Sequence, residues 1–193
     1  MDAGLAAGLE PVDVLSADGN VEARLLAEVA TLGHAPRVVA VFRRADLPRG
    51  TRDVALALWR LADPGNVGTL LRSADAFGAA VALSDGCADP LGPRALRASA
   101  GAIFRVPLLP FDDAPRPRVA LVAHGGRTLA GLPLSPPLSF VLGAEREGLP
   151  DDLLAACEEA ATIPLPGPAE SLNVAAAGAI ALYELARRTT GIR

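Results

Sequence analysis

The stretch LADPGNVGTLLRSADAFG, residues 61–78, joins a turn sequence to the pattern of an amphipathic helix. Its apolar helical positions are Val67, Leu70, Leu71, Ala74 and Phe77. At 100° per residue these five positions fall within one narrow arc, and Arg72 falls roughly opposite them. A lone arginine on the outer side of a helix is most often a solvated surface residue. The alternative is that Arg72 faces a substrate, and the choice between the two depends on the rest of the chain.

The composition is that of a globular chain with an aliphatic core. A length of 193 residues suffices for one full domain and a fragment of another. Hydrophobic residues make up 51% of the chain but aromatic residues only 4%, so Ala, Val and Leu must form the core. All 18 basic residues are arginines, whose planar guanidinium suits phosphate or carboxylate partners.

Charge is unevenly distributed along the chain. The net charge of -4 argues against a protein that holds nucleic acid by bulk attraction. Residues 37–105 nevertheless contain ten arginines and six acids, a local charge of +4. A nucleic-acid-binding surface and a random scatter of charges explain this middle section equally well.

The chain has two cysteines and two histidines, at positions 87 and 157 and at positions 34 and 124. Their spacing along the sequence fits no pattern of a zinc site. Lone thiols are typical of a reducing compartment. The first ten residues have neither a basic segment nor a long apolar run, and the apolar stretch 174–183 is too short to cross a bilayer. We therefore expect a cytoplasmic protein with no metal and no membrane association.

Apolar runs alternate with helical patterns along most of the chain. We expect strands at 37–42, 54–59, 79–84, 119–124, 138–143 and 161–165. We expect helices at 22–33, from Gly68 onward, and at 93–104, 151–160 and 171–188. This alternation predicts an α/β fold with a mostly parallel sheet and helices on both faces. Residues 43–53 are expected to form a linker, and the proline-rich stretches 111–118 and 132–137 surface connections.

Three segments that follow predicted strands carry polar residues. Segment 63–78 has Asn66 at a helix start, segment 142–150 presents Glu145 in a glycine-flanked turn, and segment 163–179 contains Ser171 and Asn173. Taken singly, Asn66 and Ser171 fit helix caps and Glu145 fits a solvated acid. Ligands of parallel sheets bind at the carboxyl ends of the strands, where all three segments are expected to meet. The chain lacks the G-x-G-x-x-G dinucleotide pattern and the lysine of a P-loop, which disfavours dehydrogenases and P-loop NTPases.

In order and content, these segments resemble the three motifs of the SpoU (TrmH-type) RNA methyltransferases of the SPOUT superfamily. The resemblance covers residues 54–188 and rests on Asn66 with Arg72 six residues later, on Glu145 in G-x-E-x-x-G-L, and on Ser171-Leu172-Asn173. The segment RASAGAIFRVPL, residues 97–108, resembles the family's sequence between its first two motifs. The family often has G-N-E-G where this chain has Ala144 and Arg146.

The resemblance implies a C-terminal deep trefoil knot, a homodimer and S-adenosylmethionine as the methyl donor. By position, the expected cofactor contacts are Leu142, Gly143, Ile163 and Leu172. Residues 51–193 would form the SPOUT-type methyltransferase domain. Residues 1–50 would be a linker or part of an N-terminal α/β substrate-binding domain.

The implied reaction is methyl transfer to a ribose 2′-hydroxyl of rRNA or tRNA, with Arg72, Asn66, Glu145, Ser171 and Asn173 as the catalytic residues. An arginine normally keeps its proton, which favours a role for Arg72 in gripping phosphate over a role as the base. Asn66 and Asn173 would position Arg72 and the ribose, and Glu145 would hold the adjoining loop. Two alternatives stay open: a non-catalytic, knotted RNA-binding protein and a small-molecule α/β enzyme. Neither the target RNA nor the target nucleotide follows from the sequence.

Overall fold

The computed structural model describes residues 2–29, 36–189 and 191. The chain divides into two compact units, Met1–Pro48 and Arg49–Arg193. The larger unit contains all three of the polar segments that follow predicted strands. It is therefore the unit that positions the candidate site.

The first unit consists of short elements. They are α1 (Asp2–Ala6), β1 (Asp13–Ser16), α2 (Ala23–Val29), β2 (Val38–Val41) and the 3-10 turn η1 (Arg44–Asp46). Strands β1 and β2 pair antiparallel, with Asp13 opposite Val41. The strand expected at 37–42 is therefore confirmed as β2. Helix α2 lies within the helix expected at 22–33, whose predicted end at Gly33 falls outside the described residues.

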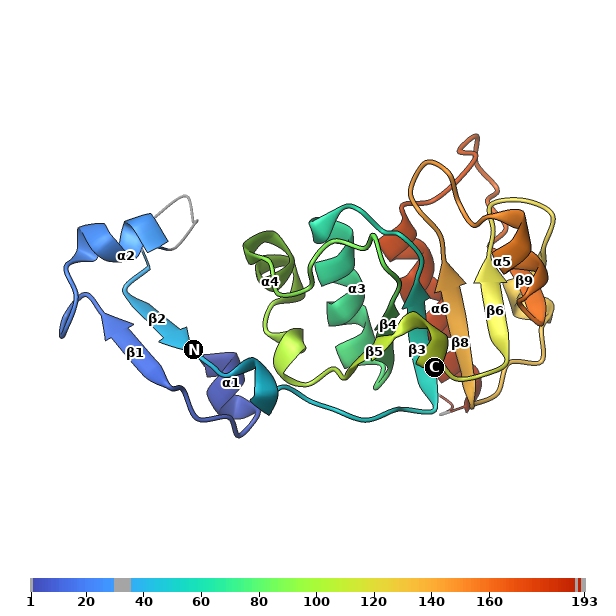
Figure 1. The fold of residues 1–193 in the computed structure, drawn as a ribbon. Helices are drawn as coiled ribbons and strands as arrows, with labels where there is room; N and C mark the ends of the chain where they lie inside the picture. Colours follow the sequence, from blue (N-terminus) through green and yellow to red (C-terminus); the bar gives the residue numbers. More distant parts are fainter. Residues whose placement is uncertain (1, 30–35, 190, 192–193) are drawn as a thin grey trace. The chain divides into compact units, whose positions relative to one another are not determined.

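The second unit is an α/β layer structure (Figure 1). Its elements are β3 (Val54–Leu58), α3 (Pro64–Ala76), β4 (Ala80–Leu83), α4 (Pro93–Ser99), η2 (Ala102–Phe104), β5 (Leu108–Pro110), η3 (Phe111–Asp113), β6 (Arg118–Leu121), β7 (Arg127–Thr128), η4 (Leu129–Gly131), β8 (Leu138–Leu142), α5 (Asp151–Ala155), β9 (Glu159–Thr162) and α6 (Val174–Thr189). In the described part of the chain its strands form one seven-stranded sheet in the order β5-β4-β3-β8-β6-β9-β7, with parallel pairing throughout. The predicted α/β class with a largely parallel sheet is confirmed.

Leucines and a phenylalanine cover one face of this sheet. Leu56 lies opposite Phe140, and Leu58 lies opposite Leu142, in the β3–β8 register. Helices α3 and α6 pack on this side, and Gly178 of α6 provides the space for the side chains of Leu70 and Leu142. A Cβ atom at this glycine would meet only the mobile ends of these two leucines, so the close packing here involves side chains that can adjust.

Alanines dominate the opposite face of the sheet. Ala55, Ala57, Ala80 and Ala82 are fully buried there and pack with Phe111 of η3 and with partly buried residues of α5 and its flanks. Because strand side chains alternate between faces, small residues on this side complement the large ones on the other. The core is thus aliphatic, as the composition predicts.

Several element boundaries differ from the sequence-based expectation. Helix α3 begins at Pro64, four residues before the predicted start, because the carboxylate of Asp63 accepts the Asn66 N–H at 2.8 Å and proline fits the first helical position. Helix α4 ends at Ser99, where Ala100 and Gly101 adopt left-handed conformations.

The C-terminal third of the chain shows two further differences. The helix predicted at 151–160 stops at Ala155, because residues from Glu159 onward pair with β6 in the sheet. The closing helix begins at Val174, not at Ser171. Strands β5 and β7 were not predicted; each has only two or three residues and is defined by pairing with a neighbouring strand. In the described part of the chain, no helix has the length and apolarity needed to cross a membrane.

Candidate active site

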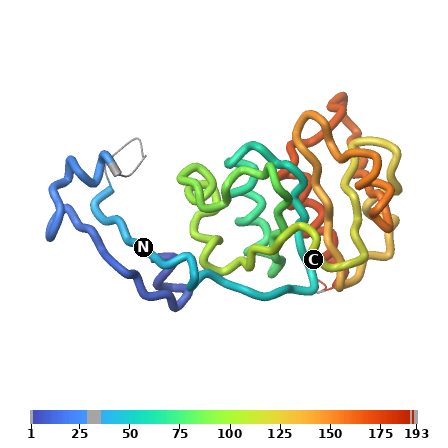
Figure 2. Tube along the Cα trace, in the orientation of Figure 1, coloured from blue at the N-terminus to red at the C-terminus, as the bar shows by residue number. Residues whose placement is uncertain are grey.

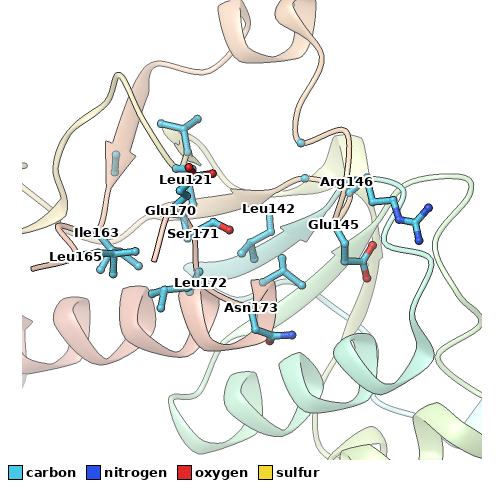
Figure 3. A pocket seen from close by; sticks show the side chains of 18 residues that line it. Leu121, Leu142, Glu145, Arg146, Ile163, Leu165, Glu170, Ser171, Leu172 and Asn173 are labelled. Carbon is cyan, nitrogen blue, oxygen red and sulfur yellow. The ribbon is translucent and has the colours of Figure 1, made fainter. Parts of the chain in front are cut away.

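A cavity of about 410 Å³ opens at the carboxyl ends of three neighbouring strands (Figure 3). It lies among the end of β6, the loop that follows β8, and the loop that leads from β9 to α6. That last loop, residues 163–173, contains neither helix nor strand, and Figure 2 traces it on the way to α6. The position agrees with the general rule that ligands of parallel sheets bind at this edge.

All four predicted cofactor contacts line this cavity. They are Leu142, Gly143, Ile163 and Leu172. The predicted site residues Glu145, Ser171 and Asn173 line it as well. Glu145 and Arg146 lie at one end of the cavity, and Ile163 and Leu165 lie at the other (Figure 3).

The loop after β8 is a tight hairpin. The N–H of Ala144 donates to the Gly148 carbonyl at 3.1 Å, and the Gly148 N–H donates back to the Ala144 carbonyl at 2.9 Å. A Cβ atom at Gly143 would overlap the backbone of Gly148, so only glycine permits this close approach. The hairpin thereby places Glu145 and Arg146 at its tip.

Glu145 links this hairpin to the start of α3. Its Oε1 accepts hydrogen bonds from Asn66 Nδ2 at 3.1 Å and from the Asp63 N–H at 3.3 Å. Asn173 Nδ2 donates to Asn66 Oδ1 at 3.1 Å. The Asn66 amide therefore bridges a residue 79 positions away and another 107 positions away in sequence. We call Asn66, Glu145 and Asn173, with Asp63, the amide network.

Helix capping at the site differs from the simple interpretation of the sequence. Asn66 does not cap α3; Asp63 does. Ser171 does not cap α6, because that role belongs to Asn173, whose Oδ1 accepts the N–H groups of Ala175 and Ala176 at 2.9 and 3.3 Å. Ser171 is exposed along the cavity. The Asn66 side chain is thus available to the amide network.

Arg72 lies apart from the residues of the cavity. It is exposed on α3 and does not line the cavity, and its side chain makes no hydrogen bond or ion pair with the residues that the structure describes. Gly68, one turn earlier on the same side of α3, packs so closely on α4 that an added Cβ would overlap the Ala95 carbonyl. Among the described residues, Arg72 contributes neither to the cavity lining nor to the hydrogen bonds of the amide network.

The sequence interpretation missed several residues around the cavity. Asp63 is part of the amide network, and its place directly before Pro64 is a recognisable capping signal. Glu170 and Arg146 line the cavity beside predicted residues. The cavity also includes Leu121, the last residue of β6, and Val122 and Ala123, which follow it. All three lie inside the strand that the sequence predicts at 119–124. Within the described ranges, no group of three or more His, Cys, Asp or Glu side chains is placed to hold a metal ion.

A parallel α/β sheet with a cavity and polar motifs at its carboxyl edge defines a class of ligand-binding α/β proteins. Residues 53–183 match the SpoU rRNA Methylase family, and the chain belongs to that family. Its membership confirms the resemblance drawn from the three motifs.

Two curated relatives illustrate the relationship. An uncharacterized tRNA/rRNA methyltransferase of Synechocystis is 33% identical over 184 residues, which cover 87% of this chain and 66% of the relative. The 23S rRNA (guanosine(2553)-2'-O)-methyltransferase RlmP of Bacillus subtilis is 34% identical over 159 residues, which cover 77% of this chain and 64% of the relative. The chain thus spans just under two thirds of the length of each.

Solved structures show the same fold. An AdoMet-bound rRNA methyltransferase from Sinorhizobium meliloti superposes with a TM-score of 0.83 at 26% identity, covering 98% of this chain and 85% of that one. A putative RNA methyltransferase of the TrmH family from Porphyromonas gingivalis has a TM-score of 0.74 at 35% identity, covering 83% and 70% of the two chains.

Proposed function

We propose that this protein is an S-adenosylmethionine-dependent RNA methyltransferase that modifies a ribose 2′-hydroxyl of rRNA or tRNA. The observation that carries the proposal is the amide network at one end of the cavity. It joins one residue from each of the three motifs, at hydrogen-bond distances of 3.1 Å. The family relationship supports the same reaction.

The cavity suits the proposed cofactor. Its volume of about 410 Å³ is in the range of small-molecule sites. Leu142, Ile163 and Leu172 provide an aliphatic surface, and the loops around Gly143 offer backbone groups that can bind an adenine edge. S-adenosylmethionine supplies a methyl group on a cationic sulfonium, and the two carboxylates of Glu145 and Glu170 favour a cation there. The proposed reaction requires no metal.

Arg72 and Ser171 are the proposed groups that act on the RNA. A ribose hydroxyl is a weak nucleophile, so it needs precise placement and a proton acceptor. The exposed guanidinium of Arg72 can grip a phosphate through two parallel hydrogen bonds and so orient the ribose. Ser171, exposed beside Asn173, can pass the hydroxyl proton to a substrate phosphate.

A deep trefoil knot is part of the proposal. The loop 163–173 shares the cavity with the hairpin after β8 and then continues into α6, which packs on α3 and β8. The family's knot requires a chain that passes between two loops before its last helix, and this path is compatible with such a passage.

We also propose a homodimer in which α3 and α6 face a second copy. Ile180 and Tyr183 of α6 are 38% and 45% exposed, and the centroid of the Tyr183 ring lies 6.5 Å from that of Phe77, the residue that caps the end of α3. Apolar side chains on two adjacent helices suit a self-association surface. Such a dimer provides a partner surface near Arg72, which lies outside the cavity of its own chain. Light scattering is expected to give twice the mass of one chain, and a monomer at micromolar concentration would refute this part.

The two units receive separate roles in the proposal. Residues 51–193 form the methyltransferase domain, and residues 1–50 belong to a partial substrate-binding domain or a linker. RNA is the proposed partner and the cytoplasm the proposed location.

Methyl transfer from labelled S-adenosylmethionine tests the proposal. Purified protein is incubated with total bacterial rRNA or with total tRNA, and the labelled nucleotide is located by its resistance to alkaline hydrolysis, since a 2′-O-methyl group blocks cleavage. We expect label in one RNA class at a 2′-oxygen. Cofactor at about 100 times its Kd should also raise the free energy of unfolding by about 2.7 kcal/mol. RNA binding without transfer would instead indicate a non-catalytic RNA-binding protein, and a methylated base would refute the ribose assignment.

A further inference from the structure

Arg60 adopts a backbone conformation that side chains rarely tolerate. Its φ is +50°, and among the described residues only Ala100 shares a positive φ without being glycine. Ala100 ends helix α4, where a left-handed residue is common. Arg60 ends no helix, and a left-handed L-residue is less stable than glycine in the same place. Because glycine would fit this position better, the Arg60 side chain is a candidate for a task of its own.

Neighbouring groups hold this conformation in place. The Arg60 N–H donates to Ser84 Oγ at 2.9 Å, and the next N–H, from Leu61, donates to Cys87 Sγ at 3.4 Å. The Cys87 thiol in turn donates to the Leu58 carbonyl at 3.3 Å. The loop after β3 is therefore tied to the loop after β4 on both sides of Arg60.

The Arg60 side chain extends over a glycine. A Cβ atom at Gly86 would lie 3.4 Å from Arg60 Nε and 3.5 Å from its Cγ, which is ordinary van der Waals contact. Arg60 is exposed, and its guanidinium makes no hydrogen bond or ion pair with the residues that the structure describes, although Asp85 is the neighbour of Gly86. A positioned stem with an unpaired charged end is suited to an anionic ligand.

Arg60 lies beside the candidate active site. The preceding residue, Trp59, donates its N–H to the carbonyl of Leu142 at 2.8 Å, and Leu142 lines the cavity. Three residues after Arg60, the Asp63 N–H donates to Glu145 in the amide network. The backbone of Arg60 thus lies between two residues that bond to β8 and the loop after it, while its side chain extends over the loop after β4.

We propose that Arg60 binds a phosphate of the RNA strand next to the target nucleotide. This inference rests on the proposed function. A strand whose ribose lies at the amide network has a phosphate on either side, and an arginine on the segment between Trp59 and Asp63 can bind one of them. The left-handed backbone of Arg60 directs the side chain along the loop after β4, which sets where the RNA leaves the site.

Three variants test the proposal. Arg60→Gly removes the charge and relieves the backbone, Arg60→Lys keeps the charge, and Arg49→Gly removes an exposed arginine before the opposite end of β3. Each protein is titrated with labelled, fragmented bacterial rRNA at several salt concentrations, and its thermal midpoint and S-adenosylmethionine affinity are measured alongside.

Arg60→Gly is expected to melt no lower than the wild type and to bind the cofactor equally well. The plot of log affinity against log salt should become less steep by about 0.7, the contribution of one phosphate contact to a single strand. At about 0.1 M salt this corresponds to binding roughly fivefold weaker than that of the wild type. The salt dependence of RNA binding should be close to that of the wild type for Arg60→Lys and equal to it for Arg49→Gly.

An unchanged slope for Arg60→Gly would overturn the inference, and so would a lower melting point with RNA affinity intact, because Arg60 would then be a structural residue. These outcomes leave the proposed function standing if the wild type methylates RNA. A wild type that neither binds nor methylates RNA would overturn both.

Discussion

Asn173 has two separable tasks, and a pair of substitutions distinguishes them. Its Oδ1 caps α6 through the N–H groups of Ala175 and Ala176, and its Nδ2 donates to Asn66. Asn173→Ala removes both interactions. Asn173→Asp keeps the capping oxygen and removes the donor. The Asn66 amide has one NH₂ group, so whichever way it then turns, either Glu145 or the new carboxylate lacks the hydrogen bond from Asn66 Nδ2.

The expected stability changes follow from these contacts. Loss of the helix cap costs about 1 kcal/mol, and loss of an exposed hydrogen bond costs about 0.5–1 kcal/mol. Asn173→Ala should therefore lower the free energy of unfolding by about 1–2 kcal/mol and the Tm by about 2–8 °C. Asn173→Asp should stay within about 0.5 kcal/mol of the wild type, because Asp caps a helix as well as Asn does.

Methyl transfer should respond differently from stability. Both variants break the amide network, and misplacement of a reacting group by about 1 Å costs about 10² in rate. The assays are thermal unfolding followed by circular dichroism and transfer from labelled S-adenosylmethionine to rRNA. If Asn173→Asp transferred methyl groups at the wild-type rate, the network would have no positioning role. If it melted as low as Asn173→Ala, the assignment of the cap would be wrong.

Three further predictions concern packing, pH and catalysis. Gly68→Ala should destabilise the protein by about 1–2 kcal/mol in urea unfolding, because the new methyl group meets the rigid Ala95 backbone. Gly178→Ala should be nearly neutral, because its methyl group meets the flexible end of a leucine side chain. Equal stabilities of the two variants would contradict this description of the packing. Hydrogen bonds from two arginines lower the pKa of Glu184 from 4.5 to about 2, so its contribution to stability is present above pH 4.5 and is lost as the pH falls toward 2. Glu184→Gln should remove that part of the acid sensitivity, and an unchanged pH profile of unfolding would exclude it. Arg72→Ala should keep fold and cofactor affinity but lose about 10² in methyl transfer, with little rescue by lysine; near-normal transfer would leave Arg72 a surface residue.

Local sequence patterns determined most of the second unit's architecture. The apolar runs at 54–58 and 80–83, and the run at 138–142 that is interrupted only by Ser139, are strands buried on both faces. The stripe around Leu70 and Leu71 is the buried side of α3. These features depend on neighbours within a few residues, so periodicity identifies them. The three motifs likewise predicted the residues around the cavity, because the carboxyl ends of parallel strands share one edge.

Only the tertiary structure decided how the site residues are connected. Asn66 looked like a helix cap, yet Asp63 performs that task and leaves the Asn66 amide to join Glu145 and Asn173. The helix predicted at 151–160 gives way to β9, because strand pairing with β6 outweighs the local helical preference. The position of Arg72 outside the cavity is also a tertiary result. Each of these outcomes depends on contacts between residues far apart in the chain, and no local pattern encodes which distant partner a side chain will meet.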